Sequence, residues 1–460
     1  MAVKSKIDPY SESAMPDALT APLTDRVFAR AEPSHACRSP LSSSIRIPSR
    51  PLNSQQITRL AVLSILCDPG PGDYLRVIGL SRNEWKKLLR WLDLNGLALY
   101  FFDQLDILEL SHLFPPDVFK RLHRRLIDNT QRTQSMISES IAIQQEFQNA
   151  RLTYANLKGL SLSPTSVPGP QLRLQFDLDF LVASNSAMRA RAILESRGYR
   201  LYSMSGRSWQ FKFNERPGVS LQDIYKDFHS YTVELHLESN VPGSPSPLDR
   251  LEWRELHNVN MPVLSPVDLL LGQGLHAFKH ICGESSRAAH LIEFRRHVLN
   301  RRRDQNFWRE LRDRTKNNSR AAIGLGVIVL LITRVTGNFA PQALTQWTAD
   351  VLPSALRLWV EMYGHRVALG GYPGNKLYLL LQEELECTGF PRQRPRRKAL
   401  FPSHLPPSII RPFPNEPLLV RIRRYSIHLL LILERVRFHI VEGLRFSVEA
   451  RRWRRIRGLQ

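Results

Sequence analysis

Two aspartates stand two positions apart in an apolar segment, as Asp177 and Asp179 within residues 174–182. Residues i and i+2 of a β-strand point to the same face, so both carboxylates are expected to project together. Two carboxylates at that distance repel each other unless a cation lies nearby. Mg²⁺ prefers such oxygen ligands together with substrate phosphates, and a pair of these ions can activate a hydroxyl and stabilise leaving pyrophosphate. The pattern indicates a metal site, with solvent-facing acids on a half-buried strand as the alternative.

A second alternating segment, Val233-Glu234-Leu235-His236-Leu237, places Glu234, His236 and Glu238 on one strand face. A third carboxylate on a neighbouring strand is the usual complement of a two-metal site. We therefore consider Glu234 the third candidate metal ligand. A solvated strand position is the alternative for this residue.

His276, Lys279 and His280 share one face of a predicted helix, because residues three and four apart are neighbours there. Two histidines at this spacing can bind zinc, but residue 277 is Ala, which rules out the HExxH motif of zinc proteases. The sequence shows no third ligand. A polar helix face packed near the site is the simpler interpretation.

The elements that must position these residues form an α/β unit followed by helices. Alternation predicts a strand over 174–182, and Ser184 is expected to cap a helix that ends at Gly198. Further strands are predicted at 199–204, 209–213 and 231–238. The segment Ser265-Pro266-Val-Asp268 is a helix start with a cap, a first-turn proline and an early acid.

The chain divides into six segments by composition and periodicity. Residues 54–150 have helical spacing, with a capping box at Ser81 and Glu84. We predict a disordered tail at 1–50, an N-terminal helical region at 51–150, an α/β core at 151–245, a helical region at 246–390, a proline-rich linker at 391–417 and a basic amphipathic helix at 418–460.

Composition favours a cytoplasmic protein with polyanionic partners. The formal net charge is +22 over 460 residues, which suits nucleic acid, nucleotides or an anionic membrane surface. No apolar leader opens the chain, and the apolar run 321–333 is too short to span a bilayer, so we expect a buried helix there. The four cysteines form no CxxC pair, which predicts neither a disulfide framework nor a zinc ribbon.

Four motifs in a fixed order carry a resemblance to a known family. They are Leu157-Lys158-Gly159, then Arg173 four residues before Asp177-Leu-Asp179-Phe-Leu-Val, then Val233-Glu-Leu-His236, then His276-Ala-Phe-Lys279-His280. Over roughly residues 55–300 the chain resembles the uncharacterised bacterial nucleotidyltransferases of the polymerase-β-like superfamily. This resemblance implies a nucleotidyltransferase fold, a small mixed sheet flanked by helices within an α/β (α+β) chain.

The resemblance also implies roles for individual residues. Asp177, Asp179 and Glu234 would bind Mg²⁺ or Mn²⁺, with Glu234 and Glu293 standing where the family usually has Asp. Gly159 would allow close backbone approach to a triphosphate, and the Lys158 ammonium would contact phosphate. Arg173 would pair with Asp177 or with phosphate, and a structural ion pair is an equal alternative. The remaining residues expected near the nucleotide or acceptor are His236, His276, Lys279 and His280.

The sequence thus predicts a nucleotidyltransferase that moves a nucleoside monophosphate from an NTP to an acceptor hydroxyl on a small molecule, protein or RNA. A catalytically silent interaction protein that keeps the fold is one alternative, supported by Glu234 and Glu293. A basic nucleic-acid-binding protein is another. The arginine-rich helix at 418–460 could contact nucleic acid or an anionic membrane, or dock on the body with a solvated basic face.

Overall fold

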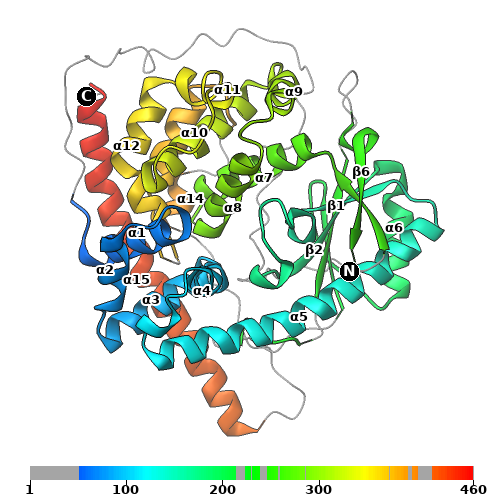
Figure 1. The fold of residues 1–460 in the computed structure, drawn as a ribbon, viewed down its shortest axis with the longest axis horizontal. Coiled ribbons are helices and arrows are strands. Elements are labelled where there is room, and N and C mark those ends of the chain that lie inside the picture. Colours follow the sequence, from blue (N-terminus) through cyan, green and yellow to red (C-terminus); the bar gives the residue numbers. More distant parts are fainter. Residues whose placement is uncertain are drawn as a thin grey trace.

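The computed structural model describes residues 51–213, 223–228, 231–238, 246–256, 259–284, 286–371, 373–391, 396–401 and 417–458. The predicted tail at 1–50 and most of the predicted linker lie outside these residues. A seven-stranded mixed sheet lies beside a larger helical body (Figure 1). The α/β fold class with flanking helices is confirmed.

The helical body is assembled from both ends of the chain. Its N-terminal part comprises α1 (Ser54–Cys67), α2 (Pro71–Ile78), α3 (Arg82–Leu94) and α4 (Ala98–Ile107). Its later part comprises α7 (Pro266–Ile281), α8 (Ala288–Asn300), α9 (Gln305–Thr315), α10 (Ser319–Thr336), α11 (Gln342–Thr345), α12 (Ser354–Ala368), α13 (Tyr378–Glu386), α14 (Arg396–Leu400) and α15 (Leu418–Ile456). One hydrophobic core joins both parts.

Two of the three predicted helix caps are present in the structure. Ser81 accepts a hydrogen bond from the Glu84 N–H, and the Glu84 side chain returns to the Ser81 backbone, so the capping box is present. Ser265 likewise accepts from the Asp268 N–H at the start of α7. Ser184 does not cap a helix: its hydroxyl donates to the Glu238 carbonyl, and α6 (Ala187–Ser196) begins after a short 3₁₀ turn.

The sheet has the strand order β3-β4-β5-β2-β1-β7-β6. The strands are β1 (Tyr154–Leu157), β2 (Asp177–Val182), β3 (Arg200–Ser205), β4 (Ser208–Lys212), β5 (Thr232–Leu237), β6 (Leu251–Leu256) and β7 (Val259–Leu264). β2 begins three residues later than predicted. β6 and β7 fall in the segment that we assigned to the following helices, and they extend the sheet because β7 pairs in parallel with β1.

One face of the sheet packs on α5 (Pro116–Asn149) and α6. Leu178, Phe180 and Val182 are buried there, and the Phe180 ring lies 5.5 Å from that of Phe147 in α5. α5 has 34 residues and is therefore roughly 50 Å long at 1.5 Å per residue. It runs from the helical body to the sheet (Figure 1). The opposite face is left for Asp177 and Asp179, as the alternation predicts.

α10 is the buried helix that the apolar run predicts. It is long and apolar enough to cross a membrane by length and composition alone, but 56% of the helix is buried inside the protein. It packs against α7 and α12. Cys67 and Cys282 are free thiols.

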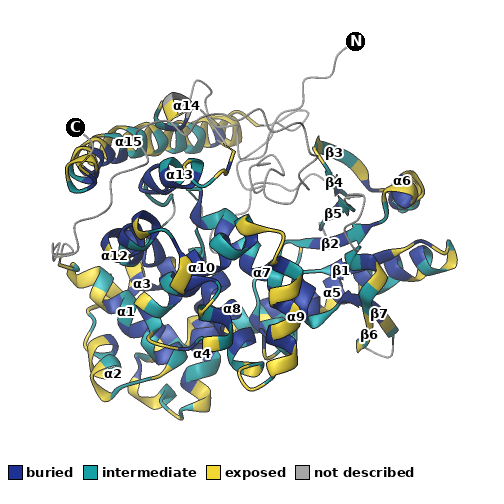
Figure 2. Ribbon diagram, turned by 90° about the horizontal axis from the view of Figure 1, so that it is seen from above, coloured by how far each residue is buried: buried dark blue, intermediate teal, exposed yellow. Residues whose placement is uncertain are grey.

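The basic C-terminal helix docks through its distal half. Trp453 is 1% exposed and donates to Glu384 at 2.9 Å, and Arg366 donates to the buried Glu449 at 2.8 Å. Its proximal half leaves apolar side chains exposed, and Figure 2 shows α15 along one edge of the body with exposed residues over much of its length. The docked interpretation therefore describes the distal half best, while Arg435 in the proximal half pairs with Glu284 at 3.3 Å.

We expect His297 of α8 to make stability fall in acid. Burial, together with the positive charges of Arg301 and Arg254, lowers the pKa of His297 to about 3. Below about pH 6.5 His297 is protonated in the unfolded chain but stays neutral in the folded protein. The free energy of unfolding should therefore drop as pH falls from 6.5 toward 3. The limiting slope for one such group is about 1.4 kcal/mol per pH unit.

Denaturant unfolding of wild type and His297→Asn between pH 7 and 4 measures this contribution. Asn keeps a donor toward Gln273, whose Oε1 lies 3.0 Å from His297 Nδ1. His112→Asn, at an exposed position, is the control. A shallower pH dependence is expected for His297→Asn alone, and equal slopes for all three proteins would contradict the assignment.

Candidate active site

Parallel pairing of β2 with β5 places two acids side by side. Asp179 lies directly opposite Glu234, and Asp177 lies opposite Thr232. β1 pairs with the other edge of β2, where Leu157 faces Asp179 and leads into the turn at Lys158. Three neighbouring strands thus bring their polar groups to one place on the open face of the sheet.

Asp179 is the most buried member of this cluster, with 6% of its surface exposed. One carboxylate oxygen, Oδ1, lies 3.2 Å from Lys158 Nζ and 2.9 Å from His236 Nε2. His236 Nε2 also lies 3.5 Å from Glu234 Oε2, and Gln210 Nε2 donates to Glu234 Oε1 at 3.1 Å. The ligand atoms of Asp179, Glu234 and His236 lie within 4.8 Å of one another.

The surroundings of His236 favour the protonated form of its ring. Burial disfavours the charged imidazole, but hydrogen bonds to Asp179 and Glu234 outweigh it and raise the pKa of His236 to about 9. The imidazolium and the Lys158 ammonium therefore neutralise the two acids at neutral pH. A divalent cation at these carboxylates would compete with both of these positive groups.

Asp177 occupies the first position of β2, on the same face as Asp179. Among the described residues, its carboxylate is not part of the cluster formed by Asp179, Glu234 and His236. The structure therefore brings two of the three predicted carboxylates together and adds His236, which we had placed among the nucleotide-binding residues. The assignment of Asp177 as a metal ligand stays a prediction.

The turn between β1 and the next 3₁₀ helix is conformationally constrained. Lys158 and Gly159 have φ angles of 50° and 42°, in the left-handed region that favours glycine. A Cβ on Gly159 would lie 2.2 Å from Gln175 Nε2, the group that donates to the Asp177 carbonyl. Glycine is needed here for both its backbone angle and this close approach, and the turn aims Lys158 at Asp179.

Arg173 anchors the segment before β2 to the helical body. Its Nε donates to Glu293 of α8 at 3.1 Å, and the Tyr100 hydroxyl donates to the same oxygen at 2.8 Å. Burial lowers the pKa of Arg173, but the charges of Glu293, Asp177 and Asp179 contribute to raising it above its ordinary value. The negative charges of the two aspartates thus act on Arg173, while its ion-pair partner is Glu293, which the sequence did not identify.

The predicted helical cluster forms a second group. His276 and His280 of α7 lie beside His290 of α8, and these three rings are packed against one another. Lys279 lies on the same helix and is half-buried. Sequence spacing could not identify His290, because it stands ten residues beyond His280 on another helix.

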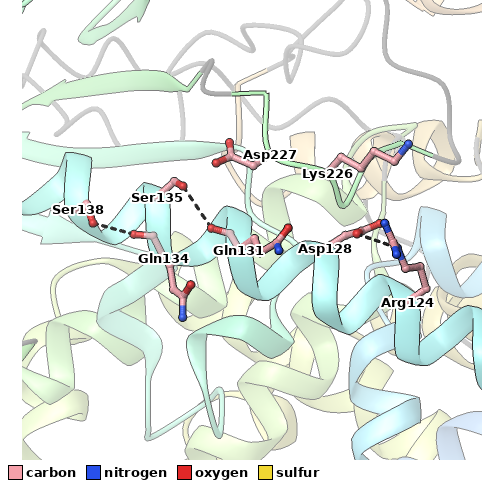
Figure 3. A pocket seen from close by; sticks show the side chains of 8 residues that line it. All are labelled: Arg124, Asp128, Gln131, Gln134, Ser135, Ser138, Lys226 and Asp227. Carbon is pink, nitrogen blue, oxygen red and sulfur yellow. Dashed lines mark hydrogen bonds and ion pairs between the residues drawn. The ribbon is translucent and has the colours of Figure 1, made fainter.

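A polar hollow lies away from these clusters along α5. It has a volume of about 620 Å³, and its lining does not include the predicted site residues (Figure 3). Side chains of α5 face Lys226 and Asp227 across it. The residues that line it are Arg124, Asp128, Gln131, Gln134, Ser135, Ser138, Lys226 and Asp227.

Comparisons with known proteins agree with the motifs. A sequence model described as an uncharacterised nucleotidyltransferase matches residues 81–336, which is more than half of the chain. One similar solved structure is an antigenic nucleotidyltransferase-like protein from Paracoccidioides brasiliensis, at 14% identity, with 45% of this chain and 95% of that chain covered. Its TM-score of 0.27 is too low to support a structural argument. No curated protein matched.

We expect Gly159→Ala to destabilise the protein and disturb the turn. The strained φ should cost about 1 kcal/mol, and the new methyl group must push away Gln175. Gly272→Ala is the control, because it lies in α7 with open space around it and should be neutral or stabilising. Urea unfolding measures both changes.

The double variant Gly159→Ala/Gln175→Ala separates the two causes. Removing the Gln175 side chain relieves the contact and leaves the backbone cost in place. A Gly159→Ala protein as stable as Gly272→Ala would show that this turn carries no constraint.

Proposed function

From the premise that the chain belongs to a family of uncharacterised nucleotidyltransferases, we propose that it transfers a nucleoside monophosphate from an NTP to an acceptor hydroxyl, with release of pyrophosphate. The observation that carries this proposal is the parallel register that sets Asp179 opposite Glu234. Asp177 lies two residues before Asp179 in β2, so its side chain points to the same face of the sheet. This arrangement offers several carboxylate oxygens at one place.

The donor set fits a hard divalent cation. Mg²⁺ and Mn²⁺ take oxygen ligands and usually bind through one or two carboxylates plus substrate phosphates. Asp179 and Glu234 would hold the ion, and Asp177 would complete the set from the start of β2. When bound, the ion would polarise the phosphate and lower the pKa of the acceptor hydroxyl.

The chain's own groups would bind and orient the substrate. Lys158 already contacts Asp179 at 3.2 Å and, from its constrained turn, can contact a phosphate as a point charge. Gly159 lets the backbone approach that phosphate closely. His236 Nε2 lies between the two acids, and one carboxylate of the pair would accept the proton of the acceptor hydroxyl.

One observation favours a second candidate, a catalytically silent protein that keeps the fold. Asp179 already contacts Lys158 and His236, and Glu234 lies 3.5 Å from His236, without a metal ion. A site that functions without a metal would keep this arrangement. Incubation with each labelled NTP and Mg²⁺ or Mn²⁺ separates the candidates, because only the transferase releases pyrophosphate and labels a small molecule, protein or RNA.

Asp177→Asn and Asp179→Asn should each abolish transfer while the fold stays intact. Losing a carboxylate that holds the metal should cost on the order of 10³-fold or more in turnover. Pyrophosphate release measures activity, and circular dichroism checks folding. Asp128→Asn in the polar hollow along α5 is the matched control and should retain full activity. Near wild-type turnover in either site variant would show that the assigned residue does not act there.

Turnover should depend more on the negative charge of the residue 234 side chain than on its length. Glu234→Gln should cripple turnover, whereas Glu234→Asp should be tolerated or improve it, because the shorter acid is the residue expected from the family resemblance. Glu252→Gln, an exposed acid on β6, serves as the control. Unchanged metal-dependent turnover in Glu234→Gln would remove this residue from the site and leave Asp177 and Asp179.

A further inference from the structure

Three histidines from two helices converge between α7 and α8. The ring centroids of His276 and His280 are 4.5 Å apart, and each lies 4.8 Å from the His290 ring. One nitrogen from each residue can be chosen so that all three lie within 4.8 Å of one another. His290 is 6% exposed, while the other two are half-buried. The His290 ring is therefore enclosed, whereas the two rings of α7 are only partly exposed.

The chemistry of this cluster differs from that of the carboxylate cluster. It offers imidazole nitrogens without a carboxylate among its three grouped residues, whereas the other cluster offers Asp179 and Glu234 with His236. Imidazole suits Zn²⁺, Cu²⁺, Ni²⁺ and Co²⁺ and is a poor match for Mg²⁺. Ordinary packing between two helices would be served by aliphatic side chains, which carry no desolvation cost.

We propose that His276, His280 and His290 form a site for a divalent transition-metal ion of the Zn²⁺ type. A tetrahedral zinc site with bonds of about 2.0–2.1 Å needs nitrogens roughly 3.3 Å apart, so modest rotations of the three rings would close the observed spacing. The i, i+4 pair supplies two ligands from one face of α7, and His290 supplies the third from α8. A fourth coordination position would then be left for water or an added ligand.

Binding there would fix α8 against α7. His290 lies one helical turn before Glu293, the residue that holds Arg173 and Tyr100. The ion would therefore also position the anchor of the segment that precedes β2. This inference does not depend on the proposed transfer reaction, because it concerns ligands and an ion of a different class.

Cobalt titration of the full chain tests the site. The protein is treated with a chelator, dialysed and titrated with Co²⁺, whose tetrahedral complexes absorb visible light. We expect the visible band to saturate at one tetrahedral Co²⁺ per chain, Zn²⁺ to displace this ion, and Zn²⁺ to raise the melting temperature. His276→Ala and His290→Ala should each weaken binding by about 100-fold or more, because removing a direct ligand costs more than the 10–100-fold typical of outer-shell changes.

Two controls keep the result decisive. His112→Ala, at an exposed position, should bind Co²⁺ like wild type, and so should Asp179→Asn. If His290→Ala fails to fold, the half-buried His276 makes His276→Ala the deciding variant. Absence of a visible band, binding that survives both histidine substitutions, or loss of the band in Asp179→Asn would each overturn the proposal.

Discussion

The register between β2 and β5 is the constraint on which the candidate site depends. Side chains alternate along a strand, so a slip of one residue would turn Asp179 toward α5 and bury a carboxylate among aromatic rings. Phe180 and Leu235 hold the register from the other face, because both are completely buried against α5 and α6. The apolar core on one face thus determines which acids meet on the other.

A buried ion pair ties this sheet to the helical body. Arg173 and Glu293 are both largely buried, and breaking such a pair by removing one partner typically costs about 3–5 kcal/mol. Glu293 accepts from Arg173 and Tyr100 through one oxygen. The longer Glu side chain at this position can extend from α8 to both donors, which gives a structural reason for the departure from the Asp of the family resemblance.

Patterns between neighbouring residues predicted the features that neighbouring residues determine, such as strand faces and helix starts. The alternation around Asp177 gave the strand and its two faces, and the caps at Ser81 and Ser265 gave helix starts. Ser184 failed as a cap because its hydroxyl found the Glu238 carbonyl, a partner 54 residues away. His290 and Glu293 joined their clusters through the packing of α8 against α7 and α4, and no spacing rule within a single helix contains that information.

Because the helical body joins segments from both ends of the chain, it can be completed only late in synthesis. Arg59 in α1 donates to the Leu369 carbonyl, a partner 310 residues later in the chain, and Trp91 donates to Gly370. At about 5–20 residues per second, ribosomes would expose α1 roughly 15–60 s before that partner exists. During this interval the apolar surface of the first helices has no native cover from α10 or α12. The first helices therefore cannot complete their native packing until the chain has been synthesised as far as Gly370.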